Sequence, residues 1–161
     1  MSEGRAICNT EILSVAPQAA SSGQVRRWAT GHLRHWQLAD DTVDAAVLML
    51  SEAVTNVFVH ARTDSTVSIA LTGEHLDVNV ADLAPRPAEA DDRLARTRPD
   101  GASAAAEPLA ESGRGLQIID ALAPAWGIRD AAGGKQLWFR LRVHRAVVDL
   151  TACPCRAGQS A

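Results

Sequence analysis

The stretch LMLSEAVTNVFVHA, residues 48–61, decides what kind of fold this sequence can form. Its apolar residues recur at helical spacing, which predicts an α-helix that packs one side on a core. Glu52, Asn56 and His60 interrupt the apolar residues and stand four positions apart. Because residues four apart drift only about 40° around a helix, these three side chains should line one stripe.

Two interpretations of the stripe are open. A plain helix face exposed to solvent also carries polar residues at this spacing. The positions that flank the stripe are apolar, however, and the stripe itself holds no lysine or arginine. A carboxylate and an amide oxygen one turn apart are ligands of the kind that Mg²⁺ accepts. The second interpretation is therefore a functional surface.

After this helix the apolar pattern changes to a period of two. Residues 66–71 and 75–82 alternate between apolar and polar positions, with Gly73 and Glu74 between them, which predicts a β-hairpin with a tight turn. Asp82 has the parity of the apolar residues, so its side chain should point to the same face.

A carboxylate that faces a core needs hydrogen-bond donors. Asp82 either caps a turn at the strand end, or it accepts a hydrogen bond from an exocyclic amine such as N6 of adenine. Guanine offers an oxygen at that position, and the mismatch would cost on the order of 1–3 kcal/mol.

The third feature is ESGRGLQIID, residues 111–120. Gly113 and Gly115 let the backbone approach a ligand, and the helix that follows offers free N–H groups for a phosphate. Arg114 would add charge, although a simple turn at a helix start remains the alternative. The sequence has no P-loop, and a dinucleotide fingerprint fails because Ile118 stands where its third glycine would be.

The predicted order is strand, helix, helix, hairpin, long loop, short helix, hairpin, with Asp40 or Asp41 as the cap of the second helix. This order predicts an α/β (α+β) two-layer sandwich, with a mixed, mostly antiparallel sheet covered on one face by helices. The ranges expected outside the first hairpin are a strand at 11–16, helices at 17–36 and from 40 to about 61, an aperiodic loop at 83–112, a helix from 113, and strands at 125–130 and 135–143.

The length of 161 residues predicts one domain, and a net charge of -3 gives no global signal for nucleic acid or an anionic membrane. The three cysteines form no disulfide framework, and Cys153 and Cys155 are too few for a zinc site. We find no signal peptide and no apolar run of about 20 residues that would span a bilayer. We expect a cytoplasmic protein with a flexible N-terminus at 1–10, one domain at 11–144, and a disordered tail at 145–161.

Together these features resemble the histidine-kinase-like ATPase superfamily of gyrase B, heat-shock chaperones and histidine kinases. Within it, the chain is similar to the anti-sigma factor serine/threonine kinases. The resemblance spans about residues 11–143. It is carried by four segments, LSEAVTNVFVHA (50–61), VNVADLAPR (78–86), ESGRGLQIIDALAPAWGI (111–128) and GGKQLWFRL (133–141).

The resemblance implies the Bergerat ATP-binding fold, with ATP and Mg²⁺ as ligands. By resemblance, Glu52 is the N-box glutamate and candidate general base, Asn56 holds Mg²⁺, and His60 closes the N-box near the phosphates. Asp82 matches the aspartate that contacts adenine, and residues 83–112 match the ATP lid. The backbone segment that would meet the phosphates is Gly113, Arg114, Gly115 and Leu116.

One position departs from the family pattern, since Ala84 replaces the usual glycine or serine two residues after Asp82. The implied function is an ATP-dependent kinase that phosphorylates an anti-anti-sigma-type antagonist protein and binds a sigma factor, with a homodimer as a further expectation. The alternatives are a catalytically inactive nucleotide-binding module that sequesters a partner such as a sigma factor, and an interaction domain without nucleotide.

Overall fold

A twisted sheet forms one layer of the molecule, and its strand order is β1-β2-β3-β6-β5-β4. The computed structural model describes residues 7–85, 96–97 and 115–145. The strands are β1 (Ile7–Val15), β2 (Ser65–Thr72), β3 (His75–Asp82), β4 (Arg96–Thr97), β5 (Ala125–Ala131) and β6 (Gly134–Arg142). The helices are α1 (Ser21–His35), α2 (Asp40–Asn56), its π-helical continuation η1 (Val57–Ala61) and α3 (Gly115–Leu122).

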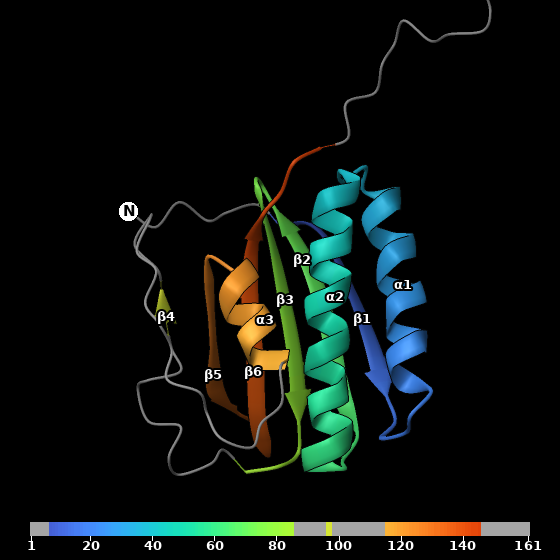
Figure 1. Cartoon of the computed structure of the whole chain (residues 1–161), viewed down its shortest axis with the longest axis vertical. Helices are drawn as coiled ribbons and strands as arrows, with labels where there is room; N and C mark the ends of the chain where they lie inside the picture. The colour runs from blue at the N-terminus through green and yellow to red at the C-terminus, as the bar shows by residue number, and fades with distance from the viewer. Residues whose placement is uncertain (1–6, 86–95, 98–114, 146–161) are drawn as a thin grey trace, which may run out of the picture.

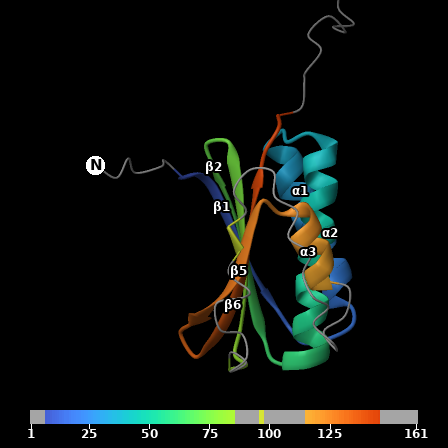
Figure 2. The same ribbon diagram turned by 60° about the vertical axis from the view of Figure 1, so that its left-hand side comes forward.

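The helices form the second layer. Figure 1 shows α1, α2 and α3 side by side in front of the sheet. Figure 2 shows them all on one side of it, so that none of the described helices covers the other face, which we call the uncovered face. Each described strand pair is antiparallel. The predicted two-layer α+β architecture and its element order are confirmed.

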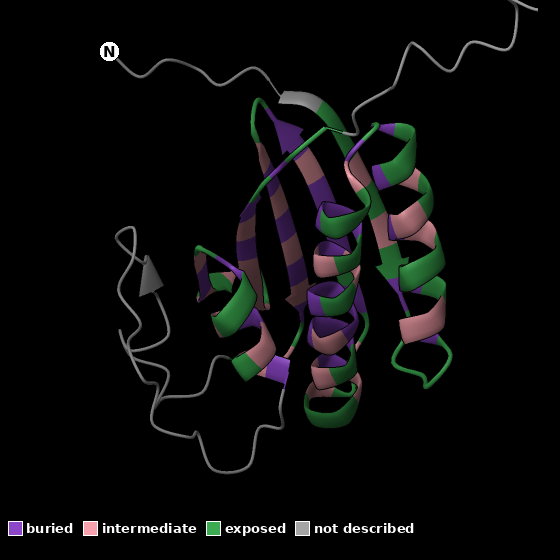
Figure 3. Ribbon diagram, turned by 45° about the horizontal axis from the view of Figure 1, so that its top comes forward, coloured by how far each residue is buried: buried purple, intermediate pink, exposed green. Residues whose placement is uncertain are grey.

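The core lies between the two layers. The strands β2 and β3 bury every second residue, as the period of two predicts, and the alternation is visible as colour bands in Figure 3. From the other layer, Leu50 and Val54 of α2 are almost fully buried. Burying a side chain of this size stabilises the fold by about 1.5–3 kcal/mol. The apolar side of α2 therefore fixes how its polar stripe is oriented.

Several element boundaries differ from the sequence expectation. The strand β1 begins at Ile7, four residues earlier than predicted, and α1 begins at Ser21 rather than at Pro17. The hydroxyl of Ser21 donates a hydrogen bond to the carbonyl of Ala16 (2.5 Å), which holds residues 16–21 in a turn before the helix.

The predicted cap of α2 was wrong. Ala39 occupies the N-cap position, without a side-chain hydrogen bond to the helix. Asp40 and Asp41 lie inside the first turn instead, where their charges interact favourably with the positive end of the helix dipole.

The long aperiodic segment is not wholly irregular. Arg96 and Thr97 form β4, which pairs with Trp126 and Ala125 of β5. Two residues are too short to produce a period in the sequence. The rest of the expected lid from residue 86 onward, the tail at 146–161 with its two cysteines, and residues 1–6 lie outside the described part of the chain.

One helix passes the length and composition criteria of a membrane span, contrary to the expectation that none would. It runs from Asp40 to Ala61, and half of its most apolar part is buried inside the fold. A central core helix meets the same criteria, because it must be apolar on the sides that pack. The contacts of this helix with the sheet and with α1 account for its composition.

Candidate functional site

The polar stripe lies where the α-helical part of the long helix ends. Asn56 is the last residue of α2, and η1 continues the chain with a wider turn. The N–H of Arg62 donates to the carbonyl of Val57 (2.9 Å), five residues earlier, and Arg62 adopts a left-handed conformation (φ 55°). Turns of this type are rare and occur often at functional sites. The exposed His60 sits in this turn rather than on a regular α-helix.

The first turn of α3 lies directly against the stripe. A Cβ atom placed on Gly115 would lie 3.0 Å from Nδ2 of Asn56 and 3.1 Å from Oε2 of Glu52. Side chains rarely approach a Cβ so closely, so glycine at this position lets the backbone of α3 lie closer to the two polar groups than a larger residue would. Glu52, Asn56 and Gly115, which are far apart in sequence, thus meet at one place.

Glu52 and Asn56 are both half-buried at this place. Within the described part of the chain, neither side chain makes a hydrogen bond or an ion pair. Their polar atoms are therefore accessible and available to a ligand. An amide oxygen and a carboxylate oxygen beside a helix N-terminus suit a magnesium ion with its phosphates, since the metal takes hard oxygen ligands and the helix end favours anions.

The second part of the site is the end of β3. Asp82 is buried, as its parity predicts, and its side chain is 3% exposed. Nζ of Lys135, directly opposite on β6, donates to Oδ1 of Asp82 at 2.9 Å, and the N–H of Ala84 donates to the same oxygen at 2.8 Å. Both donors meet on Oδ1, so Oδ2 accepts no hydrogen bond from the residues the structure describes.

The loop after β3 accommodates alanine at position 84, where the family pattern has glycine or serine. Among the described non-glycine residues only Gln37 and Arg62 have positive φ, so Ala84 does not adopt a conformation that requires glycine. Its N–H, not a side chain, closes the turn onto Asp82. Alanine therefore keeps the backbone hydrogen bond that holds the carboxylate.

Both parts of the site lie at the same end of the molecule. Figure 1 shows that β3 ends, β6 begins and α2 passes into η1 at the lower end of the view, with the start of α3 beside them. Leu116 packs its side chain against the core rather than standing free. Gly113 and Arg114 lie outside the described residues, and their predicted roles stay predictions.

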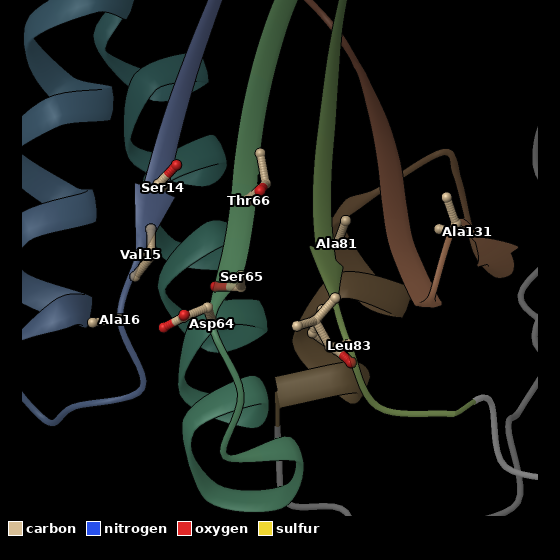
Figure 4. Close-up of a pocket in the computed structure, with 11 residues that line it drawn as sticks. Ser14, Val15, Ala16, Asp64, Ser65, Thr66, Ala81, Leu83 and Ala131 are labelled. Carbon is tan, nitrogen blue, oxygen red and sulfur yellow. The ribbon is translucent and has the colours of Figure 1, made fainter.

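A hollow of about 540 Å³ lies elsewhere, at the uncovered face of the sheet. Figure 4 shows Ser14, Thr66 and Ala81 around it, with the helices behind the strands. It reaches Asp82 at the end of β3 but includes neither Glu52 nor Asn56. This hollow is thus not the predicted pocket, which faces the helices.

The uncovered face of the sheet also holds an ion pair between Arg140 and Asp77. Nε of Arg140 lies 2.5 Å from Oδ1 of Asp77, and Nη2 donates to Oδ2 at 3.0 Å. The hydrogen bond to Asp77 raises the pKa of Arg140 above its usual value. The pair links β3 to β6 on the side opposite to the candidate site.

Sequence reasoning missed two residues of this site. Lys135 was not recognised as the partner of Asp82, and Gly134 was not recognised as a contact of the same strand end. A Cβ on Gly134 would lie 1.9 Å from the carbonyl oxygen of Asp82. The register of β3 against β6 would have revealed both, but register depends on the turn and on the loop between these strands.

Comparison with known proteins agrees with the sequence resemblance to histidine-kinase-like ATPases. A family profile described as histidine kinase-like ATPase domain matches residues 15–141. No curated protein sequence matches the chain significantly. Among solved structures, the chain is similar to the crystal structure of the RsbU and RsbW domains of Rv1364c from Mycobacterium tuberculosis, with a TM-score of 0.61 and 17% identity. The match covers 86% of this chain and 34% of that one, and at this identity it establishes the fold alone.

Proposed function

The chain belongs to the histidine kinase-like ATPase domain family, and from this premise we propose that it binds ATP between the end of β3 and the start of α3. The observation that carries the proposal is the contact of Gly115 with Glu52 and Asn56. It places the positive end of a helix beside two oxygen-bearing side chains that have no hydrogen-bond partner among the described residues. In this proposal Asp82 accepts a hydrogen bond from N6 of adenine, and the phosphates lie at the first turn of α3.

Mg²⁺ fits the same place, because the amide oxygen of Asn56 is a hard ligand that has no partner among the described residues. When bound, the metal would neutralise charge on the phosphates. The N–H groups at the start of α3, preceded by Gly113 and Arg114, would orient the phosphates. His60, exposed on η1, would lie at the outer side of the phosphate region.

The proposed reaction is phosphoryl transfer to a serine or threonine of a partner protein. The hydroxyl oxygen forms a bond to the γ-phosphorus, the bond between that phosphorus and the bridging oxygen breaks, and ADP leaves. Glu52 takes the proton of the hydroxyl as general base. Most of the acceleration would come from positioning and from the electrostatics of the site.

The proposed substrate is an anti-anti-sigma-type antagonist, and the proposed second partner is a sigma factor. The similarity to a structure that contains an RsbW domain supports this choice, together with the sequence resemblance to anti-sigma factor kinases. We place the protein in the cytoplasm, as one domain over residues 11–144, and expect it to form a homodimer.

Phosphotransfer is tested by incubating the protein with Mg-ATP and candidate antagonist proteins and mapping phosphoserine or phosphothreonine by mass spectrometry. Glu52→Gln should lower the rate at least about 100-fold, because general-base catalysis contributes on that order. Glu74→Gln, which removes an exposed carboxylate in the turn between β2 and β3, is the control and should leave the rate unchanged. Full activity of Glu52→Gln would sink the assignment of the base.

A second candidate function is nucleotide binding without turnover, in which ATP or ADP holds a state that sequesters a partner. One observation favours it: within the described residues no group donates a hydrogen bond to Glu52, and a catalytic base is normally oriented by such a partner. Stabilisation by Mg-ATP without any phosphotransfer would select this candidate.

A further inference from the structure

Lys135 is the only lysine among the sixteen lysine and arginine residues of the sequence. Every other basic position uses the planar guanidinium of arginine. The compact ammonium, which can direct its three donors in different directions, occurs only opposite Asp82, the one acidic residue in the buried set of the described chain. The use of lysine at this one position indicates a role for a compact ammonium rather than for a planar guanidinium.

The geometry of the pair leaves groups on both side chains unused. Oδ1 of Asp82 takes both the Lys135 ammonium and the Ala84 N–H, so Oδ2 is left as an acceptor. The ammonium donates one hydrogen bond to Oδ1, and within the described part of the chain it has no second acceptor. Its side chain is 22% exposed whereas that of Asp82 is 3% exposed. The pair therefore offers an acceptor and a donor next to each other.

An adjacent acceptor and donor match the Watson–Crick edge of adenine, which presents the N6 amine as a donor beside N1 as an acceptor. We infer that Lys135 reads the base together with Asp82: Oδ2 of Asp82 accepts from N6, and Nζ of Lys135 donates to N1. This inference rests on the proposed binding of ATP and adds a specificity-determining residue to that site.

Two hydrogen bonds would therefore discriminate adenine from guanine. Guanine in the same pose would place its O6 against the carboxylate and its N1–H against the ammonium, so both contacts would fail. With Asp82 alone, only one contact would fail. Lys135 thus raises the preference for adenine over guanine beyond what the carboxylate provides.

The direct test compares ATP with 1-deaza-ATP, an analogue that keeps the N6 amine but has C–H in place of N1. By calorimetry, the wild-type protein should bind the analogue about tenfold more weakly than ATP, which corresponds to about 1.4 kcal/mol. Lys135→Met should bind the two ligands within about twofold of each other. Arg129→Met, which removes an exposed basic side chain of β5, should keep the tenfold ratio.

The single lysine also permits a test on the unaltered protein, in case Lys135→Met does not fold. With lysine labelled at its side-chain nitrogen, NMR should show one lysine signal, which ATP should shift clearly and 1-deaza-ATP much less. Equal affinity of the wild type for ATP and the analogue, an unchanged tenfold ratio in Lys135→Met, or a lysine signal that does not respond to saturating ATP would each overturn the inference. Absence of ATP binding altogether would instead refute the proposed function on which it rests.

Discussion

The two donors on Oδ1 of Asp82 control which atoms the side chain can offer to a base. In Asp82→Asn, the Lys135 ammonium and the Ala84 N–H would keep the amide oxygen at the Oδ1 position. The amide NH₂ would then replace Oδ2, where it would oppose the N6 amine of adenine but match the O6 of inosine.

We therefore expect Asp82→Asn to lose ATP affinity by at least about tenfold and to gain affinity for inosine triphosphate, since each matched or mismatched polar contact is worth about 1–3 kcal/mol. Competition titrations with the two nucleotides measure the change. Because the N1–H of inosine opposes the Lys135 ammonium in both proteins, each nucleotide is compared between variant and wild type. An ATP affinity that Asp82→Asn leaves unchanged would show that Asp82 does not read N6.

At Gly115 the constraint on the candidate site is steric, because a side chain there would collide with Asn56. Gly115→Ala would place a methyl group 3.0 Å from Nδ2 of Asn56, so we expect it to push α3 away and to weaken Mg-ATP binding about tenfold while the fold persists. Gly31→Ala on α1 meets nothing within 4 Å. It should stabilise the protein by about 0.5–1 kcal/mol, with unchanged nucleotide affinity. Equal affinities of Gly115→Ala and Gly31→Ala for Mg-ATP would contradict the assigned contact.

At the scale of elements, the turn between β5 and β6 holds the end of β3 in place. A Cβ on Gly134 would lie 1.9 Å from the carbonyl oxygen of Asp82, and this backbone atom cannot move without separating the strands. Gly134→Ala should therefore lower the free energy of unfolding by about 3 kcal/mol, at the upper end of the usual cost of overpacking. Urea titration measures this value. The control is Gly73→Ala, where φ is +58° but no atom is near, and its cost should stay at about 1–2 kcal/mol.

A second link between elements joins α3 to the sheet. Nε1 of Trp126 on β5 donates to Oδ1 of Asp120 on α3 at 3.0 Å. Trp126→Phe keeps an aromatic ring but removes this donor, so we expect a loss of about 1 kcal/mol and faster amide exchange along α3. Trp138→Phe, on the uncovered face of the sheet, should leave the exchange of α3 unchanged. Equal amide exchange rates along α3 in Trp126→Phe and Trp138→Phe would contradict the assigned link.

The elements differ in how far the sequence predicted them. The hairpin of β2 and β3 and the long helix α2 carry strong periodic patterns, and both were found where expected. The widening at η1 was not predictable, because VFVHA has no feature that separates a π-helix from an α-helix. The ion pair of Lys135 with Asp82 also escaped prediction, since it joins two residues that are 53 positions apart and depends on how their strands pair.

At the scale of the whole molecule, the candidate site joins both layers, with Glu52 and Asn56 on the helix layer and Asp82 and Lys135 on the sheet. A ligand that contacts both layers binds the folded state only. Mg-ATP at about one hundred times its dissociation constant should therefore stabilise the protein by about 2.7 kcal/mol, seen as a rise in melting temperature. Mg²⁺ without nucleotide should produce a much smaller rise.

The most direct test of the account is a calorimetric titration of Mg-ATP into the wild-type protein and into Asp82→Ala. We predict saturable binding at one site per chain for the wild type, and a loss of at least about tenfold in affinity when the carboxylate is removed. No heat of binding in the wild type, or equal affinity of the two proteins, would contradict the assignment of this site to a nucleotide.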